Sequence, residues 1–382
     1  MNRQNERQLL QTLVALVNPL EAASNSGAAS NSGAASNSGP ASNSGAASNG
    51  GAASNSGARD NSAPLPLLQL ASRHRVSSYV NRLYPGGTSL RALLLADRAQ
   101  EKKQRHHDLK IIDHLRTVTE PIVLKGLVSK QLLTPDIARR SSDLDLLIGE
   151  EHIDGVSKEL AALGYRQTNR FMPIPEYRKR HHHDAPWVLE GTEQHTVEVH
   201  WHPLRNPIGS WVPVDRFFSG AVEMTIGEGV ITRLSNVDFA FNLIVHAFEG
   251  EPTQLRAVVE TALAVLRLSD SEVEQLAAAG SHPEVARVMA WSLTLVEVNF
   301  PGAVPEVLLD SLFGQAKISK SHRLIGERVL DRCGIDLDLW YGFRLGLDPL
   351  LSESSAVSAL TGAARVMATE VRKARRSAGK TQ

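Results

Sequence analysis

Strands and helices alternate between residues 121 and 171, and this alternation constrains the fold more than any other feature of the chain. Three short stretches predict strands: 121–126 and 141–149, which are rich in branched apolar residues, and "YRQTNRF" at 165–171. Two stretches with apolar residues three or four apart predict helices between them: 127–133 and 150–164. Gly164 suits the end of the second helix, because glycine readily adopts the left-handed conformation that closes many helices. The order strand, helix, strand, helix, strand indicates an α/β unit.

The second of these strands carries two acids in an apolar run. Asp143 and Asp145 are two residues apart, so in an extended strand both point to one side. Leu144 and Leu146 then point to the other side. Carboxylates this close repel each other unless a cation lies between them, and a divalent metal ion is the usual resolution. A solvated edge strand without a ligand is the alternative reading of this stretch alone.

A third acid, Glu198, stands on a later strand. In "HTVEVHWHP" (195–203), Val197 and Val199 alternate with Glu198 and His200, which predicts a strand with one polar side. If this strand lies beside that of the two aspartates, three carboxylates meet on one side of one sheet. Cations such as Mg²⁺ prefer oxygen ligands, and two of them about 4 Å apart can hold the attacking and leaving oxygens of a nucleotidyl transfer.

Six ordered segments resemble the uncharacterised nucleotidyltransferase family within the DNA polymerase β-like superfamily. They are "PIVLKGLVSK", "ARRSSDLDLLI", "LAALGY", "HHHDAPWVLEG", "VEVHW" and "DFAFNLIVHAFEGEPTQLRAVVETALAVL". The resemblance covers most of residues 66–270. It implies an α+β fold with an α/β core: a small mixed nucleotidyltransferase sheet flanked by N-terminal helices and a C-terminal helical domain. The implied activity is transfer of a nucleoside monophosphate from an NTP such as ATP to an acceptor hydroxyl or phosphate, with release of pyrophosphate.

The resemblance also implies roles for individual residues. Asp143 and Asp145 would bind two Mg²⁺ ions, with Mn²⁺ as an alternative, and Glu198 would complete the catalytic ion site. These three acids are therefore the predicted catalytic residues and metal ligands. Gly126 would lie under the triphosphate. The superfamily's usual glycine-serine turn is Lys125-Gly126 here, and Glu198 stands where aspartate is common, so phosphate contact would fall to the lysine and to backbone amides.

The predicted nucleotide contacts extend beyond this turn. They are Lys125, Gly126, Ser129, Arg139, Arg140, His182, His183 and His200. Between residues 166 and 183 a single acid, Glu176, accompanies five basic residues. The basic residues are Arg166, Arg170, Arg178, Lys179 and Arg180. This stretch is either the local basic patch that a triphosphate needs or a solvated loop.

Two other functions stay open from the sequence. A zinc hydrolase would use His182, Glu198 and His200, with His202 on the same side of the strand if the extended geometry continued that far. The Asp-x-Asp strand would then have no role. A polymerase-like fold that had lost its chemistry would leave a catalytically silent nucleotide-binding or interaction module, although all three acids are present. The apolar neighbours of His246 indicate a histidine of the core rather than a ligand.

Composition narrows the setting and the partners. Lysine plus arginine and aspartate plus glutamate both number 41, so the net charge does not favour long nucleic acid as a partner. Cys333 is the only cysteine, which excludes an intrachain disulfide and a multi-cysteine zinc site and is typical of the cytoplasm. No apolar run reaches the ~20 residues of a membrane span. The expected partners are an NTP and an unidentified acceptor, which can be a small molecule, a peptide, a protein or tRNA.

By composition and periodicity the chain divides into five parts. Residues 1–23 predict an amphipathic helix. Residues 24–64 repeat "SNSGAA", which lacks large apolar side chains and predicts a flexible linker. Residues 65–120 predict a helical segment, 121–235 the nucleotidyltransferase core, and 236–382 a helical domain with a basic tail.

Overall fold

The structure is a computed structural model that describes most of the chain between residues 88 and 333. The described residues are 88–135, 137, 139, 141, 143–168, 183–189, 195–205, 208–249 and 255–333, together with Leu13 and Val76. The predicted N-terminal helix, linker and basic tail lie outside the described residues, apart from Leu13.

A seven-stranded mixed sheet forms the centre of the described part. Its strands are β1 (Ile122–Val123), β2 (Asp143–Leu147), β3 (Tyr165–Gln167), β4 (Asp184–Leu189), β5 (His195–His200), β6 (Val222–Ile226) and β7 (Gly229–Arg233). The order is β3-β4-β5-β2-β1-β7-β6. β2 pairs with β5 and β1 with β7 in parallel, and the other pairs are antiparallel. The four predicted strands are confirmed with shorter bounds, whereas β4, β6 and β7 have no counterpart in the prediction.

The apolar sides of β2 and β5 place both strands in the interior of the sheet. Leu144 lies opposite Val197, and Leu146 lies opposite Val199. All four side chains are buried, and full burial of each stabilises the fold by about 1.5–3 kcal/mol relative to exposure. Because side chains alternate along a strand, the polar residues of both strands share the opposite side of the sheet.

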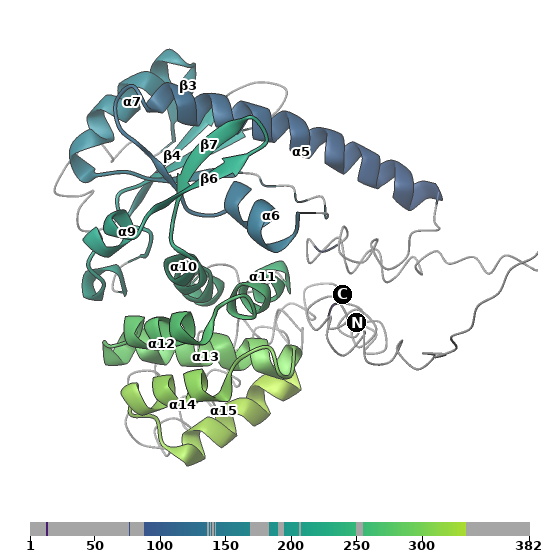
Figure 1. Cartoon of the computed structure of the whole chain (residues 1–382), viewed down its shortest axis with the longest axis vertical. Coiled ribbons are helices and arrows are strands. Elements are labelled where there is room, and N and C mark those ends of the chain that lie inside the picture. Colours follow the sequence, from purple (N-terminus) through teal and green to yellow (C-terminus); the bar gives the residue numbers. More distant parts are fainter. Residues whose placement is uncertain are drawn as a thin grey trace, which may run out of the picture.

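Helices surround the sheet and extend away from it (Figure 1). Those closest to the strands are α5 (Thr88–Leu115), α6 (Leu127–Leu133), α7 (Ile153–Ala162) and α9 (Asp215–Ser219). The helix α6 has the predicted bounds. The short 3₁₀ turn η1 (Glu150–His152) precedes α7, and Gly164 follows it at φ 86°, as expected of a helix-closing glycine.

The C-terminal elements of the described part are helical, as the sequence predicts from Asn236 onward. They are α10 (Asn236–Glu249), α11 (Leu255–Val265), α12 (Asp270–Ala279), α13 (Pro283–Asn299), α14 (Glu306–Gln315) and α15 (Lys320–Cys333). In Figure 1 they stack below the sheet, with α10 and α11 nearest to it. None of the described helices is long and apolar enough to cross a membrane. The predicted α+β fold class is confirmed.

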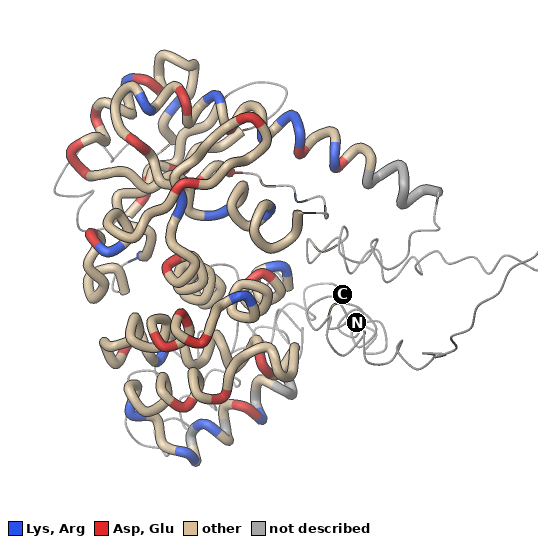
Figure 2. The backbone as a smooth tube through the Cα atoms, viewed as in Figure 1, with Lys and Arg blue, Asp and Glu red and all other residues tan. Residues whose placement is uncertain are grey.

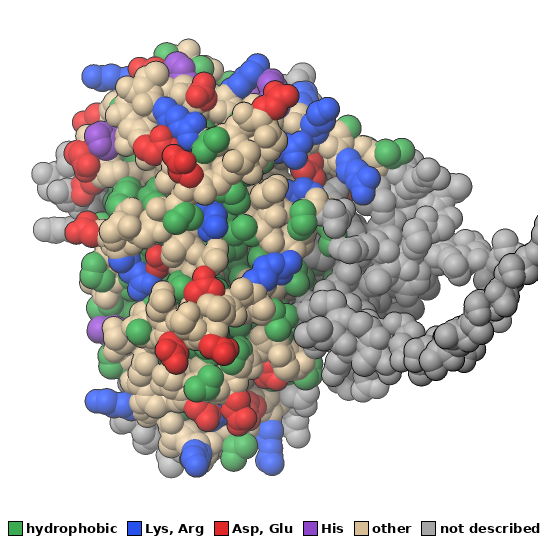
Figure 3. Space-filling view, viewed as in Figure 1, with side chains coloured by type: hydrophobic (Ala, Val, Ile, Leu, Met, Phe, Trp, Pro, Cys, Tyr) green, Lys and Arg blue, Asp and Glu red, His purple; other side chains and the backbone are tan. Residues whose placement is uncertain are grey.

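Charges of both signs are spread over the described elements. Figure 2 shows lysine and arginine interspersed with aspartate and glutamate in the upper and the lower parts of the molecule. In the space-filling view of Figure 3 the two signs mix on the visible face, with apolar side chains between them. This face therefore presents no broad basic surface of the kind that binds long nucleic acid.

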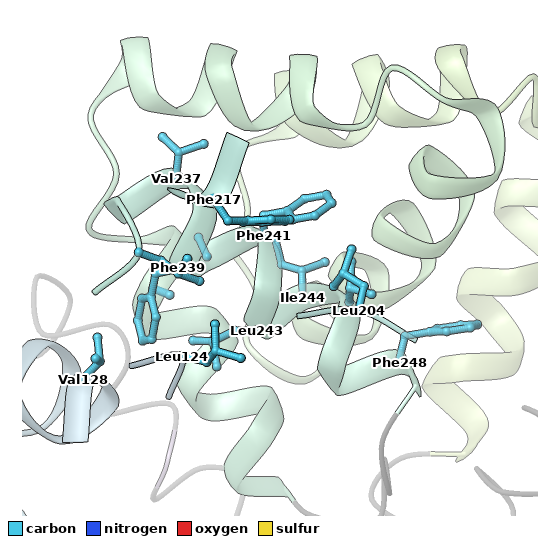
Figure 4. Close-up of a cluster of buried hydrophobic side chains, with 14 of the residues drawn as sticks. Leu124, Val128, Leu204, Phe217, Val237, Phe239, Phe241, Leu243, Ile244 and Phe248 are labelled. Carbon is cyan, nitrogen blue, oxygen red and sulfur yellow. The ribbon is translucent and has the colours of Figure 1, made fainter. Parts of the chain in front are cut away.

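The helix α10 joins the sheet to the helices below it. Every described side chain from residue 237 to 248 is buried except that of His246. Figure 4 shows side chains of α10 in one cluster with Leu124, which follows β1, and with Phe217 of α9. The ring centroids of Phe217 and Phe241 are 6.3 Å apart. A single apolar core therefore fixes the segment after β1 against α10.

A chain of buried polar side chains fastens α5 to the sheet. His195 Nε2 lies 2.7 Å from Asp108 Oδ1, and His195 Nδ1 lies 2.9 Å from Tyr165 Oη. The same hydroxyl lies 2.8 Å from His107 Nε2. Burial raises the pKa of the Asp108 carboxyl, although the His195 ring opposes this shift. Each of these groups has the partner that a buried polar group requires, so the first residue of β5 is held against α5.

A buried ion pair ties the segment before β2 to α11. Arg139 Nε and Nη2 lie 2.6 Å and 3.1 Å from the two carboxylate oxygens of Glu260. Burial alone would raise the pKa of Glu260, but the adjacent guanidinium lowers it. Removing one partner of a buried pair leaves the other charge uncompensated, which typically costs about 3–5 kcal/mol.

We expect Glu260→Gln to lower the free energy of unfolding near neutral pH by about 3–5 kcal/mol. The pKa of Glu260 in the folded protein lies below its ordinary unfolded value of about 4.3. The contribution of the pair is therefore fully present above that value and is lost as the pH falls through the folded-state pKa. Urea unfolding of the wild type and the variant between pH 3 and pH 7 measures both effects. Glu228→Gln, at an exposed position, is the control; the same acid dependence in Glu260→Gln as in the wild type would contradict the assignment.

Candidate metal centre

Parallel pairing of β2 and β5 brings the predicted acids together. Asp145 lies opposite Glu198, and Asp143 lies opposite Thr196. Alternate residues of a strand share a side, so both aspartates, Glu198 and His200 leave the same side of the sheet. The expectation that the strand of Glu198 lies beside the strand of the two aspartates is confirmed.

Asp145 is the buried centre of this group, and its side chain is 0% exposed. Lys125 Nζ lies 3.3 Å from Asp145 Oδ1, and His200 Nε2 lies 3.4 Å from the same oxygen. His200 Nε2 is also 3.6 Å from Glu198 Oε2. These contacts are ion pairs by distance but are not aligned as hydrogen bonds, and among the described residues neither oxygen of Asp145 accepts one.

The charges around Asp145 shift the pKa values of three groups. Burial alone would raise the pKa of Asp145, but Lys125 and His200 lower it below its ordinary value. Burial would lower the pKa of His200, and the carboxylates of Asp145 and Glu198 raise it instead, to about 9. The pKa of Lys125 is also raised, because the nearby carboxylates outweigh its burial. In the protein without metal, an ammonium and an imidazolium therefore balance the repulsion between the acids.

Lys125 is held in the turn between β1 and α6 by the residues on either side of it. The amide of Leu124 donates to the carbonyl oxygen of Asp145 over 3.1 Å, and the Leu124 side chain is buried in the core around α10. Gly126 follows with φ 65°, in the left-handed region that favours glycine. These constraints keep the ammonium of Lys125 beside Asp145.

The side chains present suit a divalent cation. Asp145, Glu198 and His200 each offer a ligand atom, and these atoms lie within 4.8 Å of one another. A second group with the same spacing consists of His183, Asp184 and His200. Both carboxylate oxygens of Asp145 and both ring nitrogens of His200 lack a hydrogen-bond partner among the described residues. Buried polar atoms normally have partners, and a bound cation would supply one here.

Asp143 lies at the margin of this centre. Its Oδ1 accepts a hydrogen bond from Ser141 Oγ over 2.9 Å, and its side chain is half-buried. Asp143 belongs to neither of the two groups that bring ligand atoms together, whereas His200 belongs to both. The carboxylate of Asp143 is nevertheless close enough to Lys125 to contribute to the raised pKa of that lysine.

Two of the predicted nucleotide contacts, Ser129 and Arg139, are buried in the protein interior. Ser129 is fully buried on α6. The Arg139 guanidinium pairs with Glu260, so in this structure it neutralises that carboxylate rather than the aspartates.

Arg139, Gly126 and Lys130 line a pocket between α5 and α6. Lys130 donates there to three backbone carbonyl oxygens, so the cations of this pocket already serve the fold.

The histidines near the ends of β4 and β5 have different surroundings. His183 is half-buried, and its ring centroid lies 5.4 Å from that of His200. The strand β5 ends at His200, so the extended geometry that would align His202 with it is absent. The ring nitrogens of His202 instead lie 3.1 Å and 2.9 Å from the carbonyl oxygens of Leu204 and Val212.

Several predicted contacts lie outside the described residues. They are Arg140, His182, Arg170, Arg178, Lys179 and Arg180. Arg166, from the same basic stretch, is exposed on β3. Binding of a triphosphate by this stretch, and a zinc site that includes His182, therefore stay predictions.

His246 is a residue of this site that sequence reasoning missed. Its side chain is exposed on a helix whose other described side chains from 237 to 248 are buried, and its Nε2 lies 3.3 Å from Lys125 Nζ. The surrounding protein removes part of its hydration, and together with the Lys125 ammonium this lowers the pKa of His246. The interpretation of His246 as a core histidine is therefore wrong. The almost wholly apolar sequence around His246 does not indicate that its side chain is exposed, because only the packing of α10 decides which of its residues are buried.

A family model described as "Uncharacterised nucleotidyltransferase" matches residues 63–301, which is more than half of the chain and includes all seven strands. No curated protein sequence matches. Among solved structures, JHP933 from Helicobacter pylori is similar at 14% identity and a TM-score of 0.27, over 64% of this chain and 98% of that chain. A likeness at that level supports no argument about fold or function. The match over residues 63–301 shows that the chain belongs to the uncharacterised nucleotidyltransferase family.

Proposed function

We propose that the protein is a metal-dependent nucleotidyltransferase that moves a nucleoside monophosphate from an NTP to an acceptor hydroxyl or phosphate and releases pyrophosphate. One observation carries the proposal: Asp145 lies opposite Glu198 on neighbouring strands, with Lys125 Nζ 3.3 Å from the aspartate. Paired carboxylates suit divalent ions, and an adjacent ammonium suits the phosphates that such ions accompany. Membership of a nucleotidyltransferase family supports the same activity.

The acids of β2 and β5 are assigned to divalent ions. We assign Asp145 and Glu198 to the catalytic ion and Asp143 to a second one, with Mg²⁺ or Mn²⁺ as the ion. When bound, such ions polarise the phosphates and neutralise the charge that develops during transfer. Asp145 suits a permanent ligand, because its lowered pKa keeps it ionised.

The protein groups have separate tasks in the transfer. The acceptor oxygen attacks the α-phosphorus, the bond from that phosphorus to the bridging oxygen breaks, and pyrophosphate leaves with the bonding electrons. We assign the acceptor's proton to Glu198, whose side chain is 27% exposed, whereas Asp145 is inaccessible and Asp143 already accepts a hydrogen bond from Ser141. Lys125 is assigned to the leaving phosphates, where its charge holds the pyrophosphate.

The elements around the site suggest where the acceptor binds. We assign the chemistry to residues 121–235 and the walls of the acceptor cleft to the helices of 65–120 and 236–382. The α10 side of this cleft carries His246, beside Lys125. The mixed charges of the visible face in Figure 3 favour a small molecule, a peptide, a protein or tRNA over long nucleic acid.

Labelled NTPs test the reaction type. With the protein, Mg²⁺ or Mn²⁺ and a cell extract, we expect ³²P from the α-phosphate to appear on an acceptor and ³²P from the γ-phosphate to leave as pyrophosphate. Fractionation into RNA, protein and small molecules then identifies the acceptor class. The Asp143→Asn protein is the background control. Transfer of the γ-label to an acceptor would show a phosphotransferase instead. Hydrolysis by a protein that contains stoichiometric zinc as purified would support the zinc hydrolase.

Asparagine at positions 143 and 145 should separate catalysis from stability. Asp143→Asn changes a half-buried carboxylate at the margin, so transfer should fall about 100-fold or more with little change in melting temperature. Asp145→Asn leaves Lys125 and His200 without a buried counter-ion, so it should abolish transfer and also cost about 3 kcal/mol or more of stability. Calorimetry and single-turnover assays measure the two effects. Equal stability of the two variants would contradict the central place of Asp145.

Loss of the Lys125 charge should weaken NTP binding. We expect Lys125→Met to raise the Kd of a non-hydrolysable NTP about 10- to 100-fold, because charge-assisted contacts to phosphate are worth about 1.5–3 kcal/mol. Lys110→Met is the matched control, since Lys110 is an exposed lysine of α5. Isothermal titration calorimetry in the presence of Mg²⁺ measures both. An unchanged Kd in Lys125→Met would remove this lysine from the phosphate site.

A further inference from the structure

His200 places an imidazole beside the two carboxylates of β2 and β5. Its Nε2 lies 3.4 Å from Asp145 Oδ1 and 3.6 Å from Glu198 Oε2. Neighbouring ligands of an octahedral ion with bonds of about 2.1 Å are about 3 Å apart. The imidazole therefore needs to approach each carboxylate by only about half an ångström, and the ligand atoms of all three side chains lie within 4.8 Å of one another.

The position of His200 is set by the interior of the sheet. Its backbone lies between Leu147 of β2 and Asp184 of β4, and its carbonyl oxygen accepts from the Ile148 amide over 2.9 Å. The side chain is buried, and among the described residues neither ring nitrogen has a hydrogen-bond partner. An ion bound to the ring would give a ring nitrogen the close partner that a buried polar atom normally has, in place of two long contacts to carboxylates.

The mixture of ligand types distinguishes between ions. Mg²⁺ favours oxygen ligands only, whereas imidazole suits ions of the first transition series. Mn²⁺ accepts carboxylates as readily as Mg²⁺ does and binds imidazole in addition. A site that contributes one imidazole and two carboxylates therefore matches Mn²⁺ better than Mg²⁺.

The local charge matches one divalent ion before nucleotide binds. Asp143, Asp145 and Glu198 bring three negative charges, and Lys125 Nζ, 3.3 Å from Asp145, brings one positive charge. The His200 ring binds an ion only as the neutral imidazole, so it adds no charge to the loaded site. The remaining two negative charges then equal the charge of one divalent ion. A second ion would then arrive with the negative charge of the nucleotide.

We propose that the ion shared by Asp145 and Glu198 takes the His200 imidazole as its third protein ligand, and that the site for this reason prefers Mn²⁺ to Mg²⁺. The inference rests on the proposed function, because it concerns the ion of the same site. The group of His183, Asp184 and His200 is the competing location. It lacks a carboxylate as deeply buried as that of Asp145, whose two oxygens accept no hydrogen bond from the described residues.

Pulsed electron paramagnetic resonance of Mn²⁺ added to the full chain tests the ligand directly. We expect ¹⁴N modulation from a coordinated imidazole, replaced by the ¹⁵N pattern in protein made with ¹⁵N-histidine. This labelling requires no substitution, so it remains decisive if a variant fails to fold. His200→Gln should abolish the nitrogen coupling, and His183→Gln, the matched control from the competing group, should retain it.

Metal affinity supplies a second readout. We expect Mn²⁺ to bind at least about tenfold more tightly than Mg²⁺, and the ratio to shrink in His200→Gln but not in His183→Gln. Bound Mn²⁺ without nitrogen coupling, or nitrogen coupling that persists in His200→Gln, would overturn the inference. Addition of a non-hydrolysable NTP separates this failure from failure of the proposed function. Coupling of Mn²⁺ to ³¹P without coupling to ¹⁴N would agree with the proposed nucleotidyl transfer and contradict only the assignment of His200 as a ligand. Absence of both couplings would contradict both proposals.

Discussion

Burial of the Asp145 charge is the constraint on which the rest of the centre depends. A carboxylate removed from water is tolerated only where positive charge accompanies it. Here that charge comes from Lys125 and His200, which reach the same oxygen from the turn after β1 and from the end of β5. Those two segments must therefore lie on either side of β2, as the strand order β5-β2-β1 requires. The arrangement that compensates the buried charge of Asp145 also gathers the groups that a metal and a triphosphate would use.

The helix α10 connects this centre to the helical part of the chain. Its apolar side chains pack against Leu124 and Phe217, and the same packing leaves His246 open beside Lys125. Lys125 thus lies between a carboxylate of the sheet and an imidazole of the helix. An acceptor bound against α10, as we propose, would lie next to the groups that we assign to the phosphates.

Much of the central fold follows from local patterns. The helix α6 and the strands β1, β2 and β5 have an apolar pattern in the sequence, and all of them were predicted, as was β3. The missed strands lack that signal. Pro186 within β4 argues against a strand, since proline cannot donate to a neighbour. The strand β6 lies at the edge of the sheet and is largely exposed, so it needs no apolar side, and its hairpin with β7 is set by pairing.

For the centre itself, the spacing of Asp143 and Asp145 and the alternation around Glu198 were sufficient to determine which side of each strand the carboxylates take, because side chains alternate with a period of two. Only the tertiary structure decided their partners. It placed Asp145 at the centre and Asp143 at the margin, paired Arg139 with Glu260, and brought His200 and His246 to Lys125 and the acids. These contacts join segments as far as 121 residues apart. Local spacing carries no information about such contacts, since they are set by strand order and by the packing of α10.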